Sequence, residues 1–131
     1  MDDLRAPAPA RISVIIPTLQ EEKLIASTLA QFTPELRRTE ALEIVVSDGG
    51  SSDRTVAIAS ELADVVVRHE RPERQTIAEG RNCGARAATG EIFVFLSADV
   101  TLQDPGHFFR AMRQAVDSAL RFGCKGIKVR V

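Results

Sequence analysis

Short apolar runs alternate with longer segments of mixed polarity along this chain. A short β-branched run that is bounded by turn residues is typical of a strand covered on both faces of a sheet. The runs at residues 12–16, 42–46, 65–67 and 92–96 fit this description. A fifth run begins at Ile127 and reaches the last residue, Val131. The pattern therefore predicts five strands.

The segments between these runs carry apolar residues at helical spacing. Helices are expected from Glu21 to Pro34 or slightly beyond, after a cap at Ser52 or Asp53 to Leu62, from Gln75 to Thr89, and from Pro105 to Gly123. Acidic residues in the first turn favour the first helix, because they complement the helix dipole. Two glycines, Gly80 and Gly84, lower the helix propensity of the third.

Strands that alternate with helices predict an α/β fold with an open, mostly parallel sheet and helices on both faces. Ligands of such sheets bind outside the carboxyl ends of the strands. Polar clusters follow three of the predicted strands, at residues 17–22, 48–53 and 97–99. Each cluster alone could be a turn or a helix start. Three at one edge of a sheet indicate a binding site.

Composition sets limits on the class of protein. A chain of 131 residues with 44% hydrophobic and 27% charged residues is typical of one soluble globular domain. We expect a mobile tail at residues 1–10 and a single domain at 11–131. Cys83 and Cys124 lack metal-site spacing and are expected to be buried thiols in a reducing compartment.

Charge and hydropathy exclude several partners and locations. The net charge of −1 provides no field that would gather nucleic acid. The N-terminus lacks the features of a signal peptide, and no apolar run approaches the roughly 18 residues of a membrane helix. We therefore expect no transmembrane segment and a location in the cytoplasm or at the inner membrane surface.

Four motifs make the clusters more specific. Residues 13–22 read SVIIPTLQEE, 43–53 read EIVVSDGGSSD, 80–91 read GRNCGARAATGE and 95–99 read FLSAD. In content, order and spacing they resemble glycosyltransferase family 2, over nearly everything from Arg11 to about Leu120. The resemblance implies a GT-A fold, which is Rossmann-like and binds nucleotides. The fold would be truncated on its C-terminal side, where the family has an acceptor-binding half.

The resemblance also implies a function. Family members bind a nucleoside-diphosphate sugar, usually with Mg²⁺ or Mn²⁺, and transfer the sugar with inversion. The positions that match their nucleotide-binding residues are Pro17, Thr18, Leu19, Glu21, Val46, Asp48, Arg81, Ser97 and Ala98. Asp48 matches the acid that bonds the base. Asp99 matches the last residue of the Asp-x-Asp motif, which holds the metal.

The chemistry of the residues is compatible with that implication. A diphosphate leaving group needs its charge offset, and a hard divalent cation on a carboxylate oxygen can do so. Ser97 stands where the family usually has the first Asp, so a metal-weak or metal-free site remains open. Leu19 and Gln20 replace the common Tyr and Asn. The catalytic base, the acceptor (a sugar, lipid or polymer) and self-association are not identified by the sequence.

Other charged residues allow two interpretations each. Arg68, Arg71, Arg74 and Arg81 could reach a diphosphate or belong to a solvated surface. Asp104 and His107 are close in sequence to the last motif, but a histidine ahead of a helix is more often a surface or capping residue.

Three other functions are weighed against glycosyl transfer. A shortened transferase could be a non-catalytic binding or interaction module. A receiver-type signalling domain would fit the length but needs an acidic pair directly after the first strand, where this chain has Pro17 to Gln20. A dinucleotide-dependent oxidoreductase is least favoured, because no GxGxxG follows that strand.

Overall fold

The computed structural model describes residues 9–123, which divide into two compact units. The first unit reaches Thr101, and the second begins at Leu102. The predicted tail, except its last two residues, lies outside the described residues, as do Cys124 and the strand expected at 127–131. The assignment of 11–131 to one domain stays a prediction.

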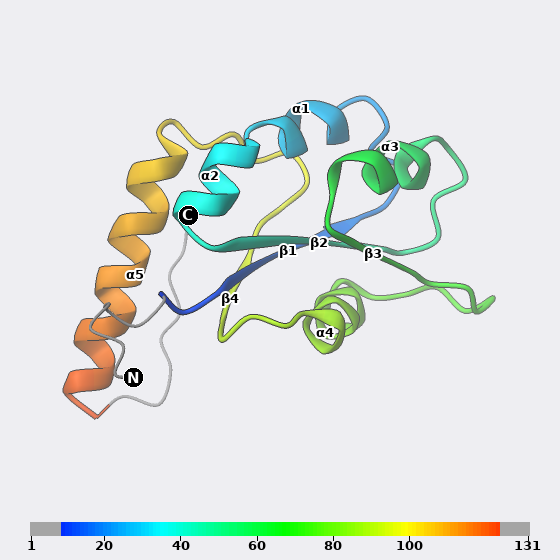
Figure 1. Ribbon diagram of the computed structural model, residues 1–131. Helices are drawn as coiled ribbons and strands as arrows, with labels where there is room; N and C mark the ends of the chain where they lie inside the picture. Colours follow the sequence, from blue (N-terminus) through cyan, green and yellow to red (C-terminus); the bar gives the residue numbers. More distant parts are fainter. Residues whose placement is uncertain (1–8, 124–131) are drawn as a thin grey trace, which may run out of the picture. The chain divides into compact units, whose positions relative to one another are not determined.

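A four-stranded parallel sheet forms the centre of the first unit (Figure 1). Its strands are β1 (Ile12–Thr18), β2 (Leu42–Asp48), β3 (Val65–Arg68) and β4 (Ile92–Phe95). They are ordered β3-β2-β1-β4, and every neighbouring pair is parallel. The predicted α/β class and four of the predicted strands are thus confirmed.

Helices cover both faces of this sheet, as the sequence predicted. Figure 1 shows α4 (Ile77–Ala87) on one face and α1 (Ile25–Ala30), α2 (Pro34–Thr39) and α3 (Thr55–Leu62) on the other. The central strands β1 and β2 are buried along almost their entire length. Their apolar side chains, such as Ile15 and Val45, are fully removed from water and form the core.

The single helix predicted from Glu21 is wrong, because this segment forms α1 and α2. Pro34 has no backbone N–H to continue the first helix and instead occupies the first turn of the second. The Thr33 hydroxyl caps that helix by accepting the Leu36 amide at 3.1 Å. The start is also later than predicted, at Ile25, because Glu21 belongs to a loop that bonds elsewhere.

The glycines that weakened the prediction of α4 have a packing role. A Cβ atom on Gly84 would lie 2.5 Å from Ile15 Cγ2 and 3.3 Å from Ser47 Cβ, so only glycine lets the helix approach the sheet this closely. The helix begins with a capping box. Thr76 accepts the Glu79 amide, and the Glu79 carboxylate accepts the Thr76 amide.

The second unit is described from Leu102 to Gly123 and consists mainly of α5 (Pro105–Arg121). Pro105 occupies the first turn, and the Asp104 carboxylate accepts the His107 amide at 3.1 Å. Asp104 is therefore the N-cap of α5, and His107 is an exposed residue inside its first turn, not ahead of the helix. Within the described part of the chain, no helix has the length and apolar character to cross a membrane.

Candidate functional site

The three polar clusters meet at one rim of the sheet. Parallel pairing places the carboxyl ends of β1, β2 and β4 on the same edge, with β1 in the middle. Thr18 pairs with Asp48, and Ile15 pairs with Phe95, so the loops that follow β2 and β4 flank the end of β1. Adjacent strands are about 4.8 Å apart. Asp48 and Asp99 therefore belong to one rim, on opposite sides of β1.

Asp48 is the most fully bonded acid of this rim. Its Oδ1 accepts the Thr18 hydroxyl at 2.8 Å and the Ser51 hydroxyl at 2.6 Å. Its Oδ2 accepts the amides of Gly50 at 3.0 Å and Ser51 at 2.7 Å. The side chain has no exposed surface. Asp48 thus orders the start of the β2–α3 loop. The predicted hydrogen bond from Asp48 to a nucleotide base stays a prediction, and it requires one of the four present donors to leave the carboxylate.

The loops that follow β1 and β2 are bonded to each other. The Gly49 amide donates to the Thr18 carbonyl at 2.9 Å, and the Gln20 amide donates to the Ser51 hydroxyl at 2.8 Å. The Glu21 amide donates to the Thr55 hydroxyl at 2.8 Å. The two clusters that the sequence separates by about thirty residues therefore form one surface.

The loop after β4 carries Ser97, Ala98 and Asp99. Ser97 and Asp99 are exposed and Ala98 is buried, so the serine and aspartate oxygens are the ones open to a ligand. Helix α1 holds this loop. The Thr28 hydroxyl donates to the Ala98 carbonyl, and the Gln31 side chain donates to the Val100 carbonyl at 2.8 Å.

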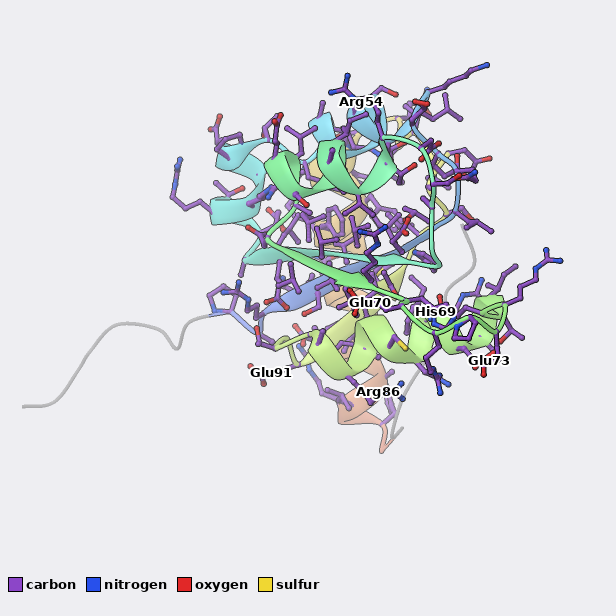
Figure 2. All side chains as sticks on the ribbon, turned by 90° about the vertical axis from the view of Figure 1, so that its right-hand side faces the viewer. Arg54, His69, Glu70, Glu73, Arg86 and Glu91 are labelled. Carbon is purple, nitrogen blue, oxygen red and sulfur yellow. The ribbon has the colours of Figure 1, made fainter. Side chains whose placement is uncertain are left out.

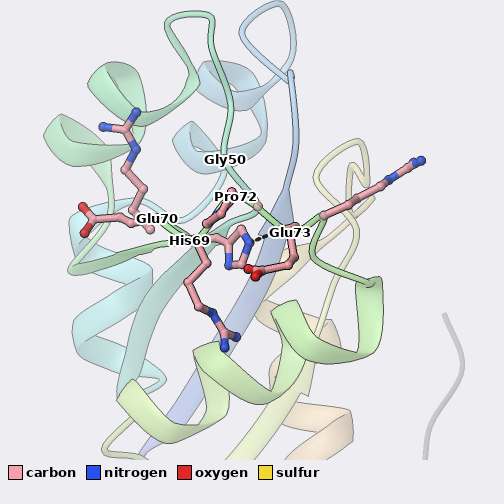
Figure 3. Close-up of a pocket in the computed structure, with 9 residues that line it drawn as sticks. Gly50, His69, Glu70, Pro72 and Glu73 are labelled. Atoms are coloured by element: carbon pink, nitrogen blue, oxygen red, sulfur yellow. Dashed lines mark hydrogen bonds between the residues drawn. The ribbon is translucent and has the colours of Figure 1, made fainter.

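A hollow of about 450 Å³ adjoins the rim. It is lined by Gly49, Gly50 and the segment 68–74 between β3 and α4 (Figure 3). The His69 ring lies 2.6 Å from the Glu73 carbonyl, and the His69 amide donates to the Asp48 carbonyl at 2.8 Å. The hollow is thus attached directly to the end of β2.

Arginines contribute to this hollow unequally. Arg68, Arg71 and Arg74 line it, whereas Arg81 does not and is exposed on α4. Figure 2 shows His69 and Glu73 at one end of α4 and Glu91 at the other. The basic side chains that line the hollow are therefore at the carboxyl rim of the sheet, where a diphosphate is expected.

The remaining site residues are placed around the end of β1. Pro17 is half-buried, Thr18 is buried and Leu19 is exposed. Glu21 is half-buried. Val46 is fully buried within β2, so its side chain cannot contact a ligand in this conformation. It can affect binding only by supporting the strand that positions Asp48.

Two carboxylates of the rim and its surroundings have pKa values lower than usual. Hydrogen bonds from Thr55, the hydroxyl first, lower the pKa of Asp53. Bonds with Thr76 lower the pKa of Glu79, which caps α4 beside the hollow. Both acids are therefore held in the charged form by the elements that they order.

The oxygen donors of the rim permit a cation but do not enclose one. Residues 9–123 contain no group of three His, Cys, Asp or Glu side chains that could hold a metal. Asp99 supplies an exposed carboxylate and Ser97 an exposed hydroxyl, which are hard oxygen ligands. A cation bound here would need further oxygens from water or from a ligand.

Several residues that shape the rim were not predicted. They are Gln20, Thr28, Gln31, Ser51 and Thr55, and they act by hydrogen bonds between segments far apart in sequence. Gln20 and Ser51 lie inside the predicted clusters but were not named as site residues. One feature of the sequence could have identified Thr28 and Thr55, since each is a polar residue on an otherwise apolar helix face. Cys83, in contrast to its predicted burial, is only half-buried.

The comparison with protein families decides the classification. The sequence model described as Glycosyl transferase family 2 matches residues 13–119. The chain belongs to this family. The match includes all four motifs and does not favour the receiver-type or oxidoreductase alternatives.

Curated relatives include two glycosyltransferases of bacteria. The chain is 32% identical over 92 residues to validoxylamine A glucosyltransferase of Streptomyces hygroscopicus subsp. limoneus, which covers 68% of this chain and 20% of that protein. It is 33% identical over 108 residues to 4,4'-diaponeurosporenoate glycosyltransferase of Staphylococcus haemolyticus, covering 79% and 28%. The chain thus spans less than a third of these family members.

Solved structures of the family show the same arrangement. A mannosyltransferase from Pyrobaculum calidifontis in complex with GDP-Man and Mn²⁺ is similar with a TM-score of 0.64 and 30% identity, covering 81% of this chain and 32% of that one. Glucosyl-3-phosphoglycerate synthase from Mycobacterium tuberculosis, in complex with Mn²⁺, UDP and glucosyl-3-phosphoglycerate, has a TM-score of 0.58 and 30% identity, covering 73% and 36%. The GT-A fold is therefore confirmed.

A short stretch has a different relative. Over 24 residues, or 18% of the chain, it is 92% identical to small ribosomal subunit protein uS3 of Acidobacterium capsulatum, of which it covers 11%. All four transferase motifs lie in the first unit, which ends at Thr101. The second unit, from Leu102, contains none of them.

Proposed function

We propose that this chain is the donor-binding part of a glycosyltransferase that takes a nucleoside-diphosphate sugar and transfers the sugar with inversion. The observation that carries the proposal is the meeting of three family motifs at one rim. The loops after β1 and β2 are hydrogen-bonded to each other, and the Asp99 loop lies on the other side of the end of β1. The two solved relatives above are bound to GDP-Man or UDP, which supports a nucleoside-diphosphate donor.

The roles follow from position. Leu19 and Glu21 emerge from the end of β1 and Asp48 from the end of β2, so they are assigned to the nucleotide. Pro17, Thr18 and Val46 support these residues from the strands. Arg81 does not line the hollow and is assigned to the nucleotide by its match to the family motif alone. Ser97, Ala98 and Asp99 lie across β1 and are assigned to the sugar diphosphate. We assign residues 11–131 to one donor-binding domain and place no catalytic base in it.

A divalent cation fits this assignment. Asp99 would hold Mg²⁺ or Mn²⁺ through its carboxylate, with the Ser97 hydroxyl beside it. The remaining oxygen ligands would come from the diphosphate and from water. When bound, the cation offsets negative charge on the diphosphate. The exposure of both side chains leaves them free to reach such an ion.

The acceptor and the cellular location extend the proposal. The acceptor is a sugar, a lipid or a polymer bound by elements other than these loops. We propose that transfer takes place in the cytoplasm or at the inner membrane surface, where nucleotide sugars are available. The proposal includes no nucleic acid as a partner.

Isothermal titration of the purified chain with UDP and with GDP, each in Mn²⁺, in Mg²⁺ and in EDTA, tests the proposal. We expect micromolar binding of one nucleotide, weakened at least tenfold by EDTA. Asp99→Asn should remove the effect of the metal, whereas Asp117→Asn, an exposed aspartate of α5, should leave it unchanged. Absence of binding by any nucleoside diphosphate would overturn the proposal.

A further inference from the structure

Gln20 has a backbone conformation that its residue type disfavours. Two described non-glycine residues have positive φ, Gln20 and Ala41, each with φ of 54°. The left-handed region is costly for a side chain other than glycine, asparagine or aspartate, so a particular set of contacts must hold it there. Ala41 precedes β2 at the opposite edge of the sheet, but Gln20 lies in the rim.

The contacts of Gln20 all reach the loop that follows β2. Its backbone amide donates to the Ser51 hydroxyl at 2.8 Å. Its Nε2 donates to the Ser52 hydroxyl at 2.9 Å, and its Oε1 accepts the amides of Ser52 at 2.7 Å and Asp53 at 3.3 Å. The carboxamide therefore satisfies two backbone N–H groups that the loop does not satisfy by itself.

The residues on either side of Gln20 extend this contact. The Glu21 amide donates to the Thr55 hydroxyl at 2.8 Å, and the Glu22 amide donates to Asp53 Oδ2 at 3.3 Å. Three successive amides of the β1–α1 loop thus donate to two side chains of the β2–α3 loop and to Thr55, the first residue of α3. Leu19 and Glu21, which flank Gln20, take their positions from this set of bonds.

We propose that Gln20 is a positioning residue for nucleotide binding, whose carboxamide clamps the β2–α3 loop to the β1–α1 loop before the ligand arrives. The inference rests on the proposed function. It assigns a role in that function to Gln20, which contacts the β2–α3 loop and not the ligand. Both loops supply groups to the rim, so a fixed spacing between them lowers the ordering cost of binding.

Exposure distinguishes this role from a purely structural one. The bonds of the Gln20 carboxamide are exposed, so water replaces them when the side chain is removed and the folded core is unaffected. The loss is then expected in ligand affinity, because the loops must be ordered during binding. A residue needed only for folding would lower thermal stability instead.

The test compares Gln20→Ala and Gln20→Gly in the purified chain. Both remove the carboxamide, but glycine relieves the left-handed backbone and alanine does not. We expect both variants to bind UDP or GDP with Mn²⁺ about tenfold more weakly, which corresponds to roughly 1.4 kcal/mol. We expect the melting temperature of Gln20→Gly to exceed that of Gln20→Ala, so affinity and stability separate.

Ala41→Gly is the matched control, since it has the same φ but lies away from the rim. It should leave nucleotide affinity unchanged. Hydrogen exchange gives a second measure, because the amides of Ser52 and Asp53 should exchange faster in both Gln20 variants without nucleotide and recover protection at saturation.

Each outcome has one meaning. If the unsubstituted chain binds no nucleoside diphosphate, the proposed function fails. If it binds and both Gln20 variants bind equally well, the proposed function stands and the clamp is wrong. If affinity falls only in proportion to melting temperature across the variants, Gln20 has a structural role and the inference is also overturned.

Discussion

Thr89 donates both its backbone amide and its hydroxyl to the carboxylate of Glu43, at 2.8 and 2.9 Å. Glu43 also accepts the Ser13 hydroxyl at 2.7 Å, and Arg11 lies 3.8 Å from it. The Glu43 carboxylate is almost fully buried at the start of β2, at the edge opposite the candidate site. It thus joins the segment after α4 to the beginning of the sheet.

This carboxylate makes stability depend on pH. Burial opposes its charge, but the bonds from Thr89 and Ser13 and the nearby Arg11 together hold the pKa of Glu43 below its usual value of 4.5. Its contribution is therefore present above that value and is lost as the pH falls through the lower folded pKa. Glu43→Gln should lower the free energy of unfolding by about 2 kcal/mol at pH 7.

Urea denaturation between pH 7 and pH 3 measures this effect. The Gln variant should lose less stability on acidification than the unsubstituted chain. Its free energy of unfolding should still fall somewhat with pH, because the pKa values of Asp53 and Glu79 are also lowered. Glu61→Gln, an exposed change on α3, is the control. Equal acid sensitivity of the Glu43 variant and the unsubstituted chain would show that Glu43 is not responsible.

Two glycines of α4 should respond differently to alanine. Gly84→Ala places Cβ 2.5 Å from Ile15, a fully buried side chain that cannot move aside, so we expect a loss of about 2 kcal/mol or more. Gly80→Ala meets the flexible end of Gln75 at 3.1 Å. The gain in helix propensity, up to about 1 kcal/mol, should make this second change neutral or stabilising. Thermal unfolding of the pair decides, and equal melting temperatures would contradict the expected close packing at Gly84.

Thr28 should matter for metal-dependent binding. Thr28→Val keeps the shape of the side chain but leaves the Ala98 carbonyl without its hydroxyl donor, which loosens the loop of Asp99. We expect nucleotide affinity in Mn²⁺ to fall three- to tenfold, on the order of 1 kcal/mol, with little change in EDTA. Ser27→Ala removes an exposed hydroxyl bonded to Leu24 on the same helix and serves as control. A loss of equal size with and without Mn²⁺ would rule out a link between this loop and the metal.

The capping box of α4 should govern local order beside the hollow. Thr76→Ala removes the acceptor of the Glu79 amide and should cost about 1 kcal/mol, because the first helical turn loses its cap. Amide exchange at Glu79 should accelerate more than exchange at the centre of the helix. Thr39→Ala at the end of α2 is the control, since its hydroxyl makes only a 3.4 Å bond. Unchanged exchange at Glu79 would show that the cap does not limit opening of this turn.

Much of the fold could be predicted from local pattern. The four described strands are short apolar runs. β1 and β2 are buried on both faces, as such runs predict, whereas β3 is only half-buried and β4 exposes Phe93 and Phe95, so cover on both faces was wrong for these two strands. The break between α1 and α2 was missed, although Thr33 and Pro34 carry the signal of a new helix start. The apolar spacing continues across Phe32 and therefore predicts one helix, whereas the cap at Thr33 begins a second one.

The rim could be predicted only in part. Strand ends indicated which clusters meet, because parallel topology brings them to one edge. The hydrogen bonds from Gln20 to Ser52 and from Thr28 to Ala98 span 32 and 70 residues, and no local spacing encodes them. The internal bonding of Asp48 was likewise invisible in the sequence, which suggested only an acid at a glycine-rich turn.

The pairing of β1 with β2 has a polar partner at each end and on each face. Ser13 faces Glu43, and five residues later Thr18 faces Asp48. A shift of one residue would turn both hydroxyls to the wrong side and leave two enclosed carboxylates without these donors. The apolar residues between them, being nearly interchangeable, would tolerate such a slip. The hydroxyl groups of Ser13 and Thr18 therefore specify the register of β1 against β2. The same register fixes the positions of the loops that follow these two strands.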